Sequence, residues 1–138
     1  MALLQKRLEL DQEFFRTLEI TEKLLMVFGD LAKDYNRLHT DEDYAKSKGY
    51  KGKVSYGNIL GLLISALVGE TLKEYEVLLI SQSINYKKPF YLGDTITLKG
   101  IIKENNEVFK VVKIKLQFSN ISGDICATGD CMVKYLND

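Results

Sequence analysis

The sequence predicts an α+β domain in which a curved antiparallel sheet encloses one apolar helix. Residues 58–72, NILGLLISALVGETL, are apolar at nearly every position and predict a helix that is buried on all sides. The chain after this helix divides into long segments rich in β-branched and aromatic residues, separated by short turn sequences. A buried helix needs a surrounding layer, and the strands that follow it supply one.

The chain before this helix begins with a predicted strand over residues 11–18. Thr21 is then suited to cap a helix, which should end near Lys33. The apolar residues of this helix fall on one face at the spacing of a surface helix, and they are Leu24, Leu25, Phe28, Leu31 and Ala32.

A second, short helix is expected after Thr40, because Thr40 and Asp43 have the spacing of a capping box. His39 would then lie just outside the start of a helix. A loop rich in Gly and Lys follows over residues 46–57 and leads into the apolar helix.

Four long strands are predicted in the second half, with turns at residues 88–93, 105–106 and 120–123. The strands cover residues 76–88, 94–104, 107–119 and 124–136. Cys126 and Cys131 are five residues apart in the last strand, so we expect them on opposite faces and unpaired. They are interpreted as ordinary thiols in a reducing compartment.

Length and charge limit the function classes. The 138 residues suggest one domain spanning 1–138. Lys plus Arg and Asp plus Glu both number 19, so no net field attracts nucleic acid or an anionic membrane. No signal peptide or membrane span is predicted, which favours a soluble, cytoplasmic protein. The single histidine and two cysteines make no metal-site signature.

Three stretches of the chain occur in the order found in one known family. The first is DYNRLH at Asp34–His39, followed by the acidic segment TDEDYA; the second is VSYGNIL at residues 54–60; the third is SQSINYKKPFYLGD at residues 81–94. They resemble the D-x-N-P-x-H motif, the HGM entry to the central helix, and the strand, proline and Gly-Asp turn of the (R)-specific enoyl-CoA hydratases, or MaoC-like dehydratases.

This resemblance implies a hotdog fold, in which the sheet wraps around a long central helix. It also implies reversible addition of water to a trans-2-enoyl-CoA, with no cofactor and with Asp34 and His39 as the catalytic pair that shares one water. Imidazole titrates near neutrality, and burial can raise the pKa of a carboxyl toward it, so both groups suit proton transfer. Considered without the motif, His39 is a surface histidine and Asp34 a solvated residue at a helix end.

Three further residues are predicted to serve the substrate. The N–H of Gly57, at the entry to the buried helix, can hold the thioester oxygen, unless Gly57 is only a turn glycine. Ser65 is a pocket residue by resemblance, or its hydroxyl bonds back to the carbonyl of Gly61. Asn36 shapes the loop that carries the catalytic pair, or is a simple turn residue.

Two residues depart from the family pattern. Arg37 stands where the family has a proline that stiffens the preceding residue, and it could instead reach a carboxylate or a CoA phosphate. Tyr56 stands where the family commonly has histidine. We expect activity to survive both changes.

A homodimer is expected, because a small sheet leaves an open edge and hotdog proteins usually pair with the ligand between protomers. The basic loop that contains Lys46, Lys48, Lys51 and Lys53 either meets CoA phosphates or is simply solvated. Two other functions stay open: an acyl-CoA thioesterase, against which the Asp-to-His motif argues, and a non-catalytic acyl-CoA-binding hotdog protein.

Overall fold

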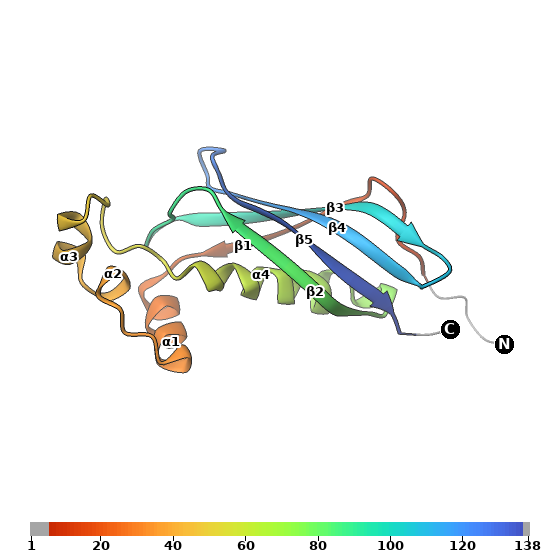
Figure 1. Cartoon of the computed structure of the whole chain (residues 1–138), viewed down its shortest axis with the longest axis horizontal. Helices are drawn as coiled ribbons and strands as arrows, with labels where there is room; N and C mark the ends of the chain where they lie inside the picture. Colours follow the sequence, from red (N-terminus) through yellow and green to blue (C-terminus); the bar gives the residue numbers. More distant parts are fainter. Residues whose placement is uncertain (1–5, 137–138) are drawn as a thin grey trace.

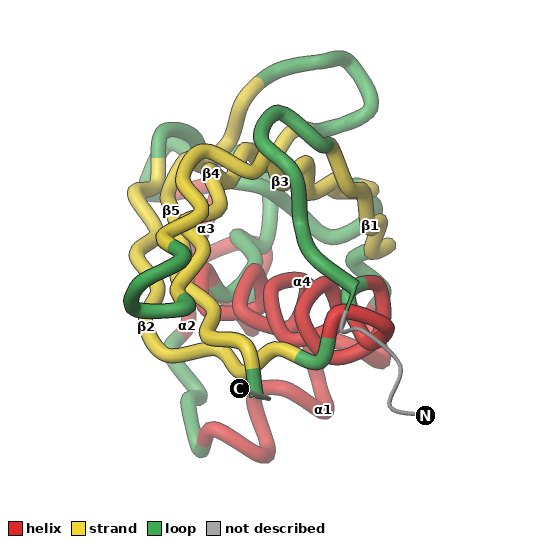
Figure 2. Tube along the Cα trace, turned by 90° about the vertical axis from the view of Figure 1, so that its right-hand side faces the viewer, coloured by secondary structure: helices red, strands yellow, loops and turns green. Residues whose placement is uncertain are grey.

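A computed structural model describes residues 6–136 of the chain. Within these residues, five strands form an antiparallel sheet in the order β1-β3-β4-β5-β2. Figure 2 shows the sheet arching over α4, and α1, α2 and α3 gather beyond one end of the sheet (Figure 1). The predicted α+β class, with a sheet around a central helix, is confirmed.

The predicted strands are all present, with changes at their ends. They are β1 (Glu13–Glu19), β2 (Val77–Tyr86), β3 (Thr95–Asn106), β4 (Val111–Ser119) and β5 (Ile125–Tyr135). Every second residue of β4, and of β3 as far as Ile102, is buried against the helix, as alternation requires. The turn expected at residues 105–106 instead covers 107–110, because Asn106 Oδ1 accepts the N–H groups of Val108 and Phe109, both at 3.0 Å.

The central helical segment runs from Gly57 to Thr71 in three parts. A 3₁₀ turn η1 (Gly57–Ile59) precedes α4 (Leu60–Ala66), and a π turn η2 (Leu67–Thr71) follows it. The prediction of burial on all sides is wrong, because the sheet covers one side only. The open side carries Asn58, Leu62, Ser65 and Gly69, and Leu62 is 42% exposed.

The first helix, α1 (Glu22–Ala32), begins and ends as predicted. Thr21 Oγ1 accepts the N–H of Leu24 at 3.0 Å, and Lys33 ends the helix in the left-handed region at φ 56°. Leu25 is buried, and Leu24 and Phe28 are partly buried. Leu31 and Ala32 are exposed, so the predicted apolar face does not extend to the last turn of the helix.

Two short helices follow, where one was predicted. Asn36 caps α2 (Arg37–Thr40), with its Oδ1 2.9 Å from the N–H of Leu38. Asp41 caps α3 (Glu42–Ser47), with its Oδ1 3.0 Å from the N–H of Tyr44. The predicted capping box on Thr40 is therefore wrong, because α3 begins one residue later with Asp41 as its cap. His39 lies inside α2, not before a helix.

Cys126 and Cys131 are both free thiols buried in the core. Phe118 pairs with Ala127 and Ser119 with Ile125, so Cys126 is an extra residue in β5. This bulge interrupts the alternation, and the expectation that the two thiols lie on opposite faces is wrong. No helix within residues 6–136 is long and apolar enough to cross a membrane.

Candidate active site

His39 lies in a cleft of about 210 Å³ at the end of the molecule where the short helices gather. The cleft is formed by α1, by α2 and by the segment that leads into η1. Its lining consists of Glu22, Leu25, Met26, Gly29, Asp30, Tyr35, His39, Thr40, Lys53 and Tyr56. The imidazole is half-buried, so one part of the ring is held by protein and another part is accessible from the cleft.

A backbone carbonyl orients the imidazole. His39 Nδ1 is 2.7 Å from the carbonyl oxygen of Val54, while the Val54 N–H donates to the carbonyl of Leu38 at 3.1 Å. Because a carbonyl oxygen only accepts, Nδ1 carries the proton of the neutral imidazole and Nε2 keeps a lone pair. This arrangement makes Nε2 a hydrogen-bond acceptor, as a general base requires.

Tyr56 packs against the imidazole and is itself almost fully buried. The two ring centroids are 4.1 Å apart with 32° between the planes. On the α1 side, the centroid of the Phe28 ring lies 5.1 Å from that of Tyr56, which is only 4% exposed. Burial raises the pKa of the Tyr56 hydroxyl, and the nearby Asp34 and Asp30 carboxylates raise it further. The hydroxyl therefore stays protonated and acts as a donor at neutral pH.

Asp34 is held in the turn that joins α1 to α2. Its N–H donates to the carbonyl of Gly29 at 3.0 Å, and its own carbonyl accepts the Tyr56 hydroxyl at 2.7 Å. Its carboxylate Oδ1 accepts the N–H of Asn36 at 3.1 Å. Asp34 is half-buried and does not line the His39 cleft. Asp34 and His39 thus both contact Tyr56, but the carboxylate is directed to the α2 turn.

Gly57 offers an unoccupied donor at the start of the central helical segment. Tyr56 provides no side-chain cap there, and the Gly57 N–H has no acceptor among residues 6–136. A Cβ at this position would lie 2.8 Å from Tyr86 Cζ, so a larger residue would displace the exposed end of the Tyr86 side chain. These features agree with the predicted role of Gly57 and also explain it as a packing glycine.

Ser65 and Asn36 do not line the His39 cleft. Ser65 is exposed on the open side of α4, and no bond from its hydroxyl to the Gly61 carbonyl is found in the described part of the chain. Asn36 is exposed and acts as the α2 cap. Its placement supports the interpretation that Asn36 shapes the loop that carries His39.

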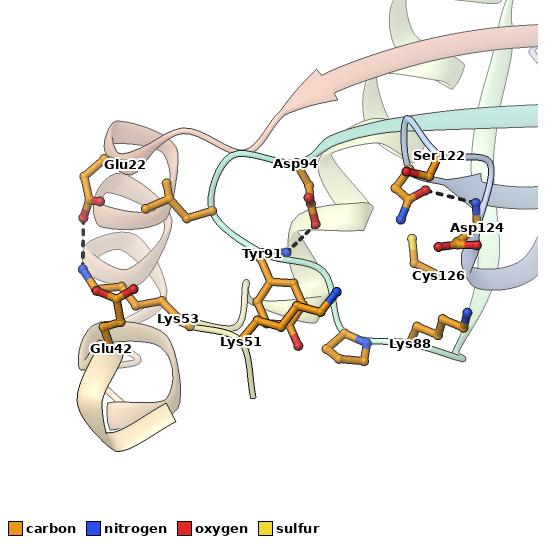
Figure 3. A pocket seen from close by; sticks show the side chains of 14 residues that line it. Glu22, Glu42, Lys51, Lys53, Lys88, Tyr91, Asp94, Ser122, Asp124 and Cys126 are labelled. Carbon is orange, nitrogen blue, oxygen red and sulfur yellow. Dashed lines mark hydrogen bonds and ion pairs between the residues drawn. The ribbon is translucent and has the colours of Figure 1, made fainter. Parts of the chain in front are cut away.

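A larger cavity of about 620 Å³ adjoins this cleft (Figure 3). The two share Glu22 and Lys53, whose side chains form an ion pair at 3.3 Å. Lys51 and Lys88 face the larger cavity together with several carboxylates, so its lining has no strong net charge. Of the predicted basic loop, only Lys51 and Lys53 line it. No three His, Cys, Asp or Glu side chains within residues 6–136 group in a way that could hold a metal ion.

Residues 4–123 of the chain match the family model described as the MaoC like domain. The chain belongs to the MaoC-like family. An (R)-specific enoyl-CoA hydratase from Aeromonas caviae is 26% identical over 107 residues, or 78% of this chain and 80% of that protein. An (R)-specific enoyl-CoA hydratase from Rhodospirillum rubrum is 31% identical over 93 residues, covering 64% of this chain and 65% of that protein.

The solved structure of an (R)-hydratase from A. caviae has a TM-score of 0.87 to this MaoC-like chain. The two are 24% identical, and the match covers 93% of this chain and 97% of the other. Together with the sheet that arches over α4, this likeness confirms the predicted hotdog fold.

Arg37 reaches a carboxylate of its own chain in this MaoC-like domain. Its Nη2 lies 3.4 Å from Asp41 Oδ2, and its guanidinium stacks over the Tyr44 ring at 4.2 Å. Arg37 is the first residue of α2, the position that proline favours in helices. Arg37 therefore contacts the cap and the first turn of α3 through its side chain.

The part that Tyr56 plays is not apparent from the sequence, where it is notable only as a departure from the family pattern. In the MaoC-like site it contacts both members of the predicted pair. Its position directly before Gly57 was the available signal. The contact with Asp34 joins residues 22 positions apart, which no local pattern indicates.

Proposed function

We propose that the protein is an (R)-specific enoyl-CoA hydratase, which adds water reversibly to a trans-2-enoyl-CoA to give a (3R)-hydroxyacyl-CoA. Membership of the MaoC-like family and the names of the relatives above support this activity. The observation that carries the proposal is the orientation of His39, whose Nε2 is left as an acceptor in the cleft by the bond between Nδ1 and the Val54 carbonyl.

In the proposed reaction, His39 Nε2 takes a proton from a water whose oxygen bonds to the β-carbon of the substrate. The electrons of the C=C bond move toward the thioester carbonyl, and the Gly57 N–H stabilises the enolate oxygen. The α-carbon then takes the proton held on His39 Nε2, which restores the neutral imidazole, so the net change is addition of one water. Asp34 helps to hold that water once its carboxylate turns from the Asn36 N–H toward the cleft. No cofactor takes part.

The remaining predicted residues have supporting roles in this proposal. Asn36 caps α2 and so fixes the helical turn that carries His39. Ser65 serves the acyl-CoA from the open side of α4 in a homodimer. An open edge at β2 supports pairing of two copies, since β2 pairs only with β5 within the described residues and carries Leu78 at 54% and Ile80 at 48% exposure. We place the protein in the cytoplasm.

A hydration assay with crotonyl-CoA tests the proposal. Loss of the ultraviolet absorbance of the enoyl thioester, without release of free CoA to a thiol reagent, identifies a hydratase and excludes a thioesterase. Chiral analysis of the product should give the 3R alcohol. Binding of crotonyl-CoA without turnover would instead indicate a non-catalytic acyl-CoA-binding protein.

Side-chain variants connect this activity to the site. We expect Asp34→Asn and His39→Ala each to lower kcat by about 10²–10⁴-fold, the usual contribution of a positioned acid or base. Asp11→Asn is a matched control. Asp11 has φ 67°, a conformation that asparagine tolerates well, and it lies in the loop before β1, so its replacement should leave the rate unchanged.

A further inference from the structure

Tyr56 connects the two residues of the proposed catalytic pair. Its hydroxyl donates to the Asp34 carbonyl at 2.7 Å, and its ring covers a face of the His39 imidazole at 4.1 Å. Among the described residues, no other side chain has a recorded contact with both. The turn of Asp34 and the helix of His39 are therefore joined through one buried side chain.

The position of Tyr56 is itself closely defined. Its side chain is only 4% exposed and packs on Phe28 of α1. Gly29 of α1 leaves the space that the hydroxyl occupies, since a Cβ there would overlap Tyr56 Oη. On the preceding residue, the Ser55 N–H donates to the Phe90 carbonyl at 2.8 Å and ties the strand-like segment to the chain beyond the central helix. Tyr56 therefore gives Asp34 and His39 a fixed surface to contact.

The segment that Tyr56 holds has few other attachments. Arg37 occupies the position of the family proline, and its contacts to Asp41 and Tyr44 are exposed ones that contribute little rigidity. The Asp34 carbonyl would lose its donor if the Tyr56 hydroxyl were absent. The turn over residues 33–36 would then be held mainly by the Asp34 N–H and the α2 cap.

We propose that Tyr56 is a positioning residue of the hydratase site, which fixes the Asp34 turn through its hydroxyl and the plane of the His39 ring through its aromatic face. This inference rests on the proposed function. Tyr56 acts through Asp34 and His39 and does not itself exchange a proton with the substrate.

Comparing the kinetics of the wild type, Tyr56→Phe and Tyr135→Phe tests the role of the Tyr56 hydroxyl. Tyr56→Phe keeps the ring and deletes the bond to Asp34, so kcat should fall about tenfold while KM changes less than about twofold. Tyr135→Phe is the matched control, because Tyr135 is equally buried and its hydroxyl accepts the Leu8 N–H at 2.9 Å. It should lose a similar amount of thermal stability and keep wild-type kcat. Equal kcat in all three proteins would overturn the proposal.

Nuclear magnetic resonance tests the ring contact independently of turnover. His39 is the only histidine in the sequence, so an untagged protein gives one unambiguous imidazole Cε1–H resonance. Tyr56→Phe should leave this resonance near its wild-type position, and Tyr56→Leu should move it downfield because the ring current is lost. An unmoved resonance in folded Tyr56→Leu would overturn the ring contact, whereas absence of hydration by the wild type would overturn only the proposed function.

Discussion

Gly29→Ala should destabilise the protein, although alanine is the better helix former. Gly29 lies within α1, where replacing glycine by alanine normally gains about 0.5–1 kcal/mol. Here the added methyl group would overlap Tyr56 Oη and lie 3.2 Å from Tyr56 Cζ and 3.3 Å from the Asp34 carbonyl oxygen. Tyr56 must move, because the other neighbour is backbone.

The expected size follows from the competing terms. Overpacking a buried site costs about 1–3 kcal/mol, and loss of the Tyr56 hydrogen bond adds about 1 kcal/mol. Against the helix gain, the net loss in unfolding free energy is about 1–3 kcal/mol. With an unfolding entropy of about 2.1 cal/mol/K per residue over 138 residues, the Tm should fall by roughly 3–10 °C.

Thermal unfolding of matched variants measures this effect. Gly69→Ala is the control, because Gly69 is exposed in η2 and no atom lies within 4 Å of its added Cβ. It should be neutral or slightly stabilising. In a Tyr56→Phe background the overlapping oxygen is gone, so Gly29→Ala should cost measurably less there. A Gly29→Ala protein as stable as Gly69→Ala would refute the packing described for Tyr56.

Two other predictions concern the site loop and the core. Arg37→Pro should fold and keep activity within a few fold of the wild type, because Asn36 already has φ −58° and ψ 133°, a conformation that suits a residue before proline. A gain of orders of magnitude in the crotonyl-CoA assay would mean that the native loop is a poor catalyst. Burial, aided by Asp130, raises the pKa of the Cys131 thiol to about 12, against about 8.5 in the unfolded chain. The neutral thiol therefore contributes stability that is fully present below about pH 8.5 and is lost as the pH rises toward 12. Iodoacetamide at pH 8 should alkylate Cys131 only after unfolding in urea, and mass spectrometry of the native protein showing rapid alkylation would contradict its burial.

Much of the fold could be predicted because local chemistry and alternation specify it. α1 begins after the Thr21 cap and ends at Lys33, as expected, and the buried positions of β3 and β4 follow a period of two. The failures arise where tertiary structure decides. Thr40 and Asp41 are both good caps, and the path of the chain selects Asp41. Similarly, the bulge at Cys126 depends on pairing with β4, which no single strand reveals.

The candidate site was predictable to the extent that it resides in short motifs. The spacing of DYNRLH identified His39, and the structure places His39 in a cleft beside the start of the central helical segment. The direction of the Asp34 carboxylate was not predictable, because it depends on an Asn36 N–H that also belongs to the α2 turn. Nor was the exposure of Ser65, which depends on which side of α4 the sheet covers.

The central claim is that Asp34 and His39 act as one unit on a single water, and the most direct measurement is kcat/KM for crotonyl-CoA hydration in the wild type, Asp34→Asn, His39→Ala and the double variant. If the two groups share one step, the double variant should be about as slow as the slower single variant. Single variants that keep wild-type rates, or losses that multiply in the double variant, would contradict a shared catalytic role.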